Sequence, residues 1–170
     1  MAATFSWSQR NGVASAVVDT DLGISGNLFN FKKNDSATAA DYSSNPITAG
    51  DKSMEVYLRA KFTGSFNKID NLQFWKSTDF SPATGLSVKW YPNGLSAYAT
   101  PTSGLSKAIS AVPTSDPGSA NLRVGAFSAL SASLAASGYS SHIVLQLNTT
   151  SAAAAGDTSL ATFTLNYDES

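Results

Sequence analysis

The chain has 170 residues, which is the size of one ordinary domain and too short for two. Charged residues make up only 14% of it, the net charge is -1, and its lysines and arginines are scattered. A nucleic-acid-binding protein needs a basic patch to neutralise phosphates, so this class of partner is excluded. The absence of cysteine excludes disulfide frameworks, thiolate metal sites and cysteine nucleophiles.

The sequence contains no apolar run that approaches the roughly 20 residues needed to span a bilayer. Its first ten residues also lack the basic and apolar regions of a signal peptide. We therefore expect a protein that is made in a cytoplasm, has no standard leader and does not enter a membrane.

Small residues take the place of charged ones, with 27 Ser, 25 Ala and 15 Thr. A surface poor in charge suits contact with other proteins, because an unpaired charge is costly to bury in an interface. A robust extracellular β-domain has the same composition, so composition alone leaves both interpretations open.

Alternation of apolar and polar residues, the period of a half-buried β-strand, runs through most of the chain. A first strand is expected around Phe5 and Trp7, and a second over Val13–Asp19. Alternation is lost between residues 34 and 53, where Asn45-Pro46 interrupts the sequence. Proline removes a ladder donor, so this region is predicted to be a long loop across one end of the fold.

The clearest strand covers residues 54–62. Its apolar set is predicted to face the core: Met54, Val56, Leu58, Ala60 and Phe62. Its second set is predicted to face solvent: Glu55, Tyr57, Arg59 and Lys61. This strand is expected to have one buried and one wet side.

Five further strands are predicted by the same alternation, over residues 72–76, 86–91, 122–126, 142–147 and 161–167. The stretch Tyr91-Pro92-Asn93-Gly94-Leu95 is predicted to be a tight hairpin turn, in which glycine supplies a positive φ.

A short amphipathic helix is possible over residues 126–137, because Phe127, Leu130 and Leu134 are spaced by three and four. The many serines there weaken its helix propensity. Eight or so short strands separated by turns predict an all-β fold, an antiparallel β-sandwich or jelly roll, as a single domain over residues 1–170.

The only histidine, His142, could be a general base or a metal ligand. Without a second histidine or any cysteine, a zinc site has too few of its preferred ligands, so a structural histidine facing the surface or a loop is expected. Asp19 and Asp21 could chelate calcium, but the closing glutamate of a calcium loop is missing, which favours a turn held by aspartate hydrogen bonds.

A hydrolase would need a carboxylate pair assembled from scattered residues such as Glu55, Asp70, Asp79 and Asp168. The sequence has no nucleophile elbow and no phosphate-binding glycine loop. We therefore predict no enzymatic activity, no cofactor and no metal.

Exposed aromatic side chains could form a platform on which sugars stack. The candidates are Trp7, Trp75, Trp90, Tyr57 and Tyr91. Coverage of the same rings by a loop or by another subunit is the favoured alternative, since tryptophan, tyrosine and arginine also supply most of the energy of protein interfaces.

The segments 47–66, 69–77, 98–102 and 112–117 resemble a group of small structural proteins from tailed-bacteriophage virions. The resemblance spans about half of the chain and contains no catalytic motif. It implies a capsid decoration, or cement, protein on the capsid surface that binds the major capsid protein and itself, as a homotrimer or homodimer. Avidity over a repeated lattice and closed symmetry would suit this role.

The residues predicted to contact a partner are Tyr57, Arg59 and Trp75. Two other functions remain open at this point. One is a carbohydrate-binding β-sandwich module or an adhesion protein of a tail or fibre, and the other is an unrecognised hydrolase.

Overall fold

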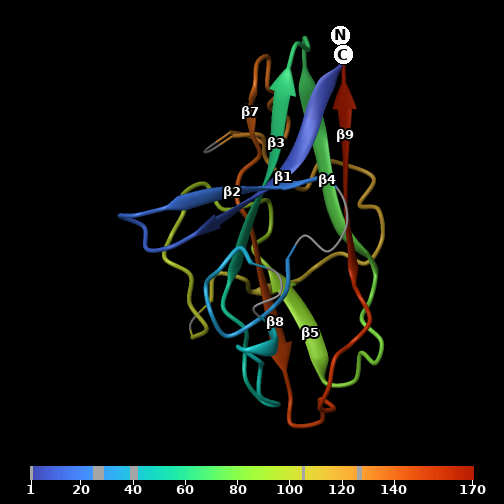
Figure 1. Cartoon of the computed structure of the whole chain (residues 1–170). Helices are drawn as coiled ribbons and strands as arrows, with labels where there is room; N and C mark the ends of the chain where they lie inside the picture. The colour runs from blue at the N-terminus through green and yellow to red at the C-terminus, as the bar shows by residue number, and fades with distance from the viewer. Residues whose placement is uncertain (1, 25–28, 39–41, 105, 126–127) are drawn as a thin grey trace.

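The computed structural model describes residues 2–24, 29–38, 42–104, 106–125 and 128–170. These residues form nine strands and no helix (Figure 1). The strands are β1 (Ala3–Asn11), β2 (Val18–Gly23), β3 (Val56–Gly64), β4 (Ile69–Thr78), β5 (Leu86–Trp90), β6 (Ser110–Ala111), β7 (Gly138–Tyr139), β8 (Ile143–Thr149) and β9 (Thr162–Glu169). The predicted all-β fold is confirmed.

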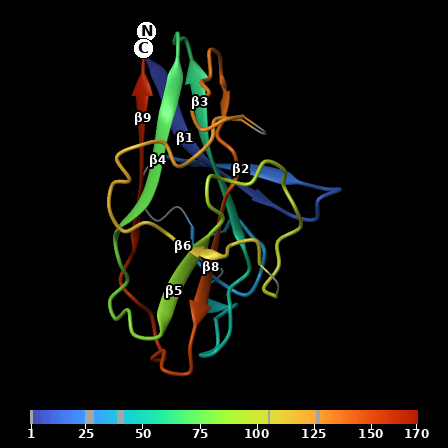
Figure 2. The same cartoon turned by 180° about the vertical axis from the view of Figure 1, so that it is seen from behind.

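The strands divide unequally between two antiparallel sheets. The larger has seven strands in the order β2-β1-β3-β8-β5-β6, with β7 also paired to β3, and the smaller contains only β4 and β9. The two sheets form the layers of a sandwich, and both chain ends lie at the same end of it (Figures 1 and 2). There the backbone N–H of Ala3 donates to Glu169 Oε1 at 2.6 Å.

One hydrophobic core fills the space between the sheets. Its centre is aromatic: the Phe74 ring stacks on Phe163 at 5.9 Å and meets Trp7 edge-on at 6.3 Å. The apolar side of β3 faces this core, with Leu58 and Phe62 almost completely buried. The inward set predicted for this strand is therefore correct for Val56, Leu58, Ala60 and Phe62, whereas Met54 precedes β3 and is not part of the core.

Two predicted strands are absent or shorter than expected. β2 begins at Val18 rather than Val13, because residues 12–17 form the turn that joins it to β1. Residues 122–126 form no strand in their described part; Leu122 and Val124 make only isolated bridges. The long loop predicted over residues 34–53 contains no strand in its described part, where Lys52 makes one isolated bridge to Asn148.

The helix predicted over residues 126–137 is wrong over its described residues, 128–137; residues 126 and 127 lie outside the description. The backbone of Leu134 instead exchanges two hydrogen bonds of 2.9 Å with Ile69, at the edge of β4. Because serines give this segment little helix propensity, its backbone forms hydrogen bonds with the start of β4 instead of forming a helix.

A turn forms at Tyr91–Gly94, as predicted, but it does not make a hairpin. After the turn, the backbone of Leu95 exchanges hydrogen bonds with His142, the residue just before β8. Leu95 therefore lies beside the chain that continues into β8, the strand with which β5 pairs. Both Asn93 and Gly94 have positive φ. Glycine is required at position 94 for two reasons: its φ is positive, and an added Cβ would lie 1.9 Å from Ser141 Oγ.

Candidate contact surfaces

The side of β3 predicted to be wet is buried except at Lys61, whose side chain is 30% exposed, so the prediction that Tyr57 and Arg59 are exposed anchors is wrong. Tyr57 is 0% exposed and Arg59 is 8% exposed. A loop covers this side, and the Tyr98 ring lies against Tyr57 with centroids 4.9 Å apart. Trp75, the third predicted contact residue, is half-buried on β4 with Thr164 of β9 as its register partner.

Glu55 occupies the same covered side and is 2% exposed. Its Oε1 accepts hydrogen bonds from the N–H of Lys107 at 2.6 Å and from Ser106 Oγ at 2.8 Å. Its Oε2 accepts from the N–H of Thr102 and from the Tyr57 hydroxyl, both at 3.3 Å. The carboxylate therefore organises the loop that covers β3, using donors rather than a cation.

An ionic group sits beside it at the base of the β1–β2 hairpin. Arg10 holds Asp19 through two hydrogen bonds of 2.8 and 3.0 Å, and Arg59 donates to the same carboxylate at 2.8 Å. Burial opposes ionisation of Asp19, but the Arg10 hydrogen bond and the charges of both arginines outweigh it, so the pKa of this carboxyl is lowered. The Arg59 guanidinium also stacks on the Tyr139 ring, 3.8 Å from its centroid.

His142 is 5% exposed, so it does not face the surface; it faces a loop, the second alternative predicted for it, with its ring against Leu95 and Tyr98. Its Nδ1 lies 3.1 Å from the carbonyl oxygen of Leu95, and its Nε2 lies 3.4 Å from Arg10 Nη1. This geometry suits a neutral ring with its proton on Nδ1. Burial, together with the charges of Arg59 and Arg10, lowers the pKa of His142 to about 4.

These polar residues form one structural unit, which we call the polar layer. Its members Glu55, Tyr57, Arg59 and His142 are buried, and its members Arg10, Asp19 and Tyr98 are partly open to solvent. Their polar groups are largely engaged with one another or with backbone. The polar layer links the base of the hairpin to Arg59 on β3 and to Tyr98 in the covering loop.

The hairpin tip, residues 12–18, projects from this base and away from the body of the molecule (Figures 1 and 2). Its sequence, Gly-Val-Ala-Ser-Ala-Val-Val, contains no charge. Val13 is 51% exposed and Val18 is 60% exposed, and the small residues 14–16 between them are exposed as well. The tip is therefore an apolar surface presented to solvent.

Hydrogen bonds to the body hold this tip in place. The Tyr98 hydroxyl donates to the carbonyl of Gly12 at 2.6 Å, and the N–H of Ala14 donates to Thr100 Oγ1 at 3.0 Å. Asp35 Oδ2 accepts from the N–H of Gly12 at 2.6 Å. Gly12 has a φ of 93°, and an added Cβ would lie 2.5 Å from the carbonyl oxygen of Ala16. The turn is thus fixed both by its glycine and by its contacts.

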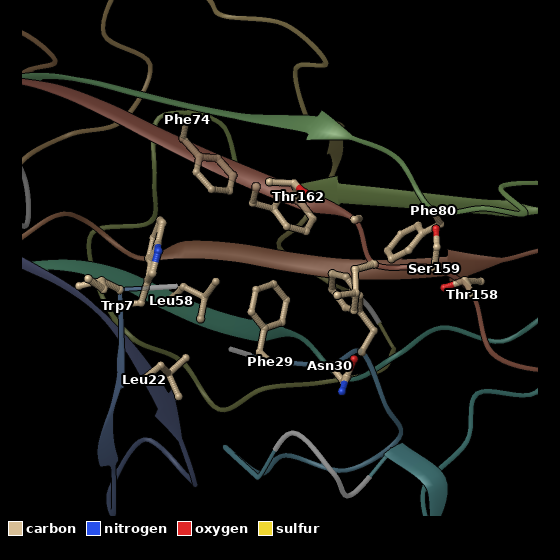
Figure 3. Close-up of a pocket in the computed structure, with 15 residues that line it drawn as sticks. Trp7, Leu22, Phe29, Asn30, Leu58, Phe74, Phe80, Thr158, Ser159 and Thr162 are labelled. Carbon is tan, nitrogen blue, oxygen red and sulfur yellow. The ribbon is translucent and has the colours of Figure 1, made fainter. Parts of the chain in front are cut away.

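A cleft opens between the two sheets, with a cavity volume of about 480 Å³. Figure 3 shows Trp7, Leu58 and Phe74 pointing into it from strands of both sheets, with Phe29 and Phe80 further along. None of the described residues that line it is charged. Ile24 and Leu160 stand at its rim, 65% and 60% exposed.

A second hollow, of about 900 Å³, adjoins the cleft and shares Phe31, Phe80 and Leu160 with it. Its described lining includes one charged residue, Asp157. Together the two hollows leave one side of the sandwich open and mostly apolar.

The carboxylates considered for a hydrolase are spread over the molecule. Asp70 and Asp168 are brought together as register partners on β4 and β9, where Asp70 pairs with Lys68 at 2.5 Å and Asp168 accepts from Asn71 at 3.0 Å. Neither lines the cleft described above. Asp79 is instead bound to Lys76 at 2.6 Å.

Asp19 and Asp21 do not converge on a shared cation position. Asp19 is held by two arginines, while Asp21 pairs with Lys61 at 2.9 Å and accepts from the N–H of Gly23 at 3.0 Å, as expected for an aspartate turn. Among the described residues, no group of three or more His, Cys, Asp or Glu could hold a metal ion. Those residues also contain no helix that could cross a membrane.

Two of the three tryptophans considered for a sugar-stacking platform are buried and cannot contact a sugar. Trp7 and Trp90 belong to the core and are 7% and 4% exposed, which leaves only the half-buried Trp75. The cleft offers phenylalanine rings, but its polar groups are few for a ligand covered with hydroxyls.

Comparison with known proteins adds no relative: no family model, no curated protein and no solved structure matches the chain. The resemblance to phage virion proteins therefore stays a prediction. Sequence reasoning missed the hairpin tip, although its signal was present as a charge-free run between Arg10 and Asp19. The cleft has no such signal, because its lining comes from segments far apart in the sequence.

Proposed function

We propose that this chain is a non-enzymatic structural protein of a tailed-phage virion, which decorates the capsid by binding the lattice of the major capsid protein. The observation that carries the proposal is the hairpin tip, an exposed and uncharged apolar surface held on a rigid base. Contact with another protein is one of the functions that contiguous exposed apolar surface serves.

The chemistry of the tip favours a protein as partner. Burying Val13 and Val18 removes apolar area from water and desolvates no charge, so each contact is favourable without needing a matching ion. Because hydrogen bonds already fix the backbone of the tip, little ordering free energy is lost on binding. A partner with a complementary apolar surface would meet both conditions.

A capsid lattice explains how so small a contact suffices. The tip offers a few small side chains, and one such contact is weak. A lattice presents many equivalent sites, so linked copies of the protein rebind before all of them dissociate. The resemblance of residues 47–66 and 69–77 to virion proteins favours the same kind of partner.

Co-sedimentation with purified particles of the phage that encodes the chain tests the proposal. We expect the wild-type protein to sediment with particles stripped of it, and Val13→Asp/Val18→Asp to remain in the supernatant. Ile109→Asp is the matched control, because Ile109 is 69% exposed and lies outside the tip. If wild-type protein stayed in the supernatant, or if the control were lost as fully as the tip variant, the proposal would be overturned.

A further inference from the structure

We infer that the hairpin tip of one copy docks into the cleft between the sheets of a second copy, so that the protein associates with itself through a head-to-tail contact. The inference shares with the proposed function the use of the tip as a contact surface. It concerns the free protein, and the capsid has no part in it.

The two surfaces match chemically. The tip has no charged residue, and neither do the described residues that line the cleft. Val13 and Val18 would meet the phenylalanine-rich lining, while Ile24 and Leu160 at the rim would be covered at the same time. A contact of this kind removes four large exposed apolar side chains from water and leaves no ion unpaired.

The position of the two surfaces requires a second copy. β2 begins at the tip with Val18, and Leu22, near its other end, lines the cleft. The four residue steps from Val18 to Leu22 span about 13 Å of extended strand, so the tip and the cleft face different parts of the surroundings. The tip therefore cannot fill the cleft of its own chain.

The depth of insertion is set by the hairpin's own chemistry. Directly behind the tip, Arg10 and Asp19 form an ion pair, and the Asp19 side chain is still 39% exposed. Carrying that pair into an apolar cleft would cost its remaining hydration. Only residues 12–18 are thus suited to enter, and the ion pair would stop at the rim.

A contact between two different surfaces is heterologous, and repetition of it generates a closed ring or an open chain unless two copies exchange tips reciprocally. The closed forms are a dimer with exchanged tips or a cyclic ring. In either form every tip and every cleft is occupied, so self-association and capsid binding compete for the tip, and a copy binds the capsid only after its tip has left the cleft.

Complementation between two variants tests the contact. Val13→Asp disables the tip and Leu160→Asp disables the cleft, and both positions are exposed, so neither change disturbs the core. Light scattering on purified protein at micromolar and higher concentration is expected to show an oligomer for the wild type and a monomer for each variant alone. An equal mixture of the two variants should give a one-to-one dimer, because one intact tip and one intact cleft remain.

The double variant Val13→Asp/Leu160→Asp is the matched control, since it has neither an intact tip nor an intact cleft. Mixed with either single variant, it cannot supply the missing surface, so only monomers are expected. A wild-type protein that is monomeric throughout, or variants that fail to complement, would overturn the inference. Either result leaves the co-sedimentation experiment to decide the proposed function separately, because that experiment measures binding to the particle.

Discussion

The polar layer and the hairpin tip are joined by the same two strands. Together they reverse the usual distribution of side chains in a soluble protein, in which charged groups are exposed and apolar groups are buried. In the polar layer, charged groups such as Glu55 and Arg59 are buried, whereas the tip exposes Val13 and Val18. The difference indicates a division of labour. The buried charges hold the hairpin in one position, and the exposed apolar side chains are left available for contact, so mutations should separate stability from association.

Glu55→Ala is expected to have the largest effect on stability. It would leave the buried Tyr57 hydroxyl and the part-buried donors of Ser106 and Lys107 without their acceptor. Because an unsatisfied buried donor costs about 1–3 kcal/mol, and part of the loop can relax, we expect a loss of about 4 kcal/mol in the free energy of unfolding. Urea unfolding measures it, with the exposed Asp157→Ala as control. A loss below that of the control would mean that the polar layer does not stabilise the fold.

Acidification should weaken the polar layer next. His142 has a pKa of about 4 in the folded protein, against 6.5 in an unfolded chain. Between these values the unfolded chain binds a proton that the folded chain does not, so stability falls as pH drops through this window. The full effect is about 3 kcal/mol, from about 1.4 kcal/mol for each pH unit.

Urea unfolding at several pH values from 7 to 4 gives this slope, and His142→Gln should remove most of it over the same range. The lowered pKa of Asp19 adds a further loss in the same direction at lower pH, as its carboxylate becomes protonated. An unchanged slope in His142→Gln would show that another group is responsible.

Asp19→Asn should have a smaller but distinct effect. It removes the negative charge shared by Arg10 and Arg59, of which Arg59 is mostly buried. Breaking a buried ion pair costs several kcal/mol, but Asp19 is 39% exposed, so we expect a loss of about 2 kcal/mol. Asp21→Asn, which breaks the exposed pair with Lys61, is the control and should cost less. Equal losses would mean that the shared position of Asp19 has no special role.

Alternation in the sequence predicts which residues of a strand share a face, and this sets how much of these two regions can be predicted. Leu58 and Phe62 were placed correctly because period two identifies which residues share a face of a strand. It does not say what covers the other face, so it predicts solvent-facing positions for Tyr57 and Arg59, which the covering loop buries. The covering loop, through Tyr98 and Thr102, makes contacts more than 40 residues away along the chain, and a local pattern carries no information about them.

Short elements set a second limit. β6 and β7 have two residues each and owe their strand geometry to neighbours, not to an alternating pattern of their own. The hairpin tip was placed within a predicted strand, since Val13, Val17 and Val18 favour strands by propensity. A glycine at position 12 with positive φ, and the acceptor offered by Asp35, turn the chain there instead.

The smallest stability effect is expected at the tip, and it provides the sharpest contrast with the polar layer. Val13→Asp should change the free energy of unfolding of the monomer by no more than about 0.5 kcal/mol, because surface substitutions outside special contacts rarely do more. Its oligomeric mass in solution should nevertheless fall to that of a monomer. The comparison must be made on dilute protein, since association itself stabilises the folded state at higher concentration. A destabilisation of dilute Val13→Asp as large as that of Asp19→Asn would place the tip among the elements that hold the fold, and the division between a stabilising base and a contacting tip would fail.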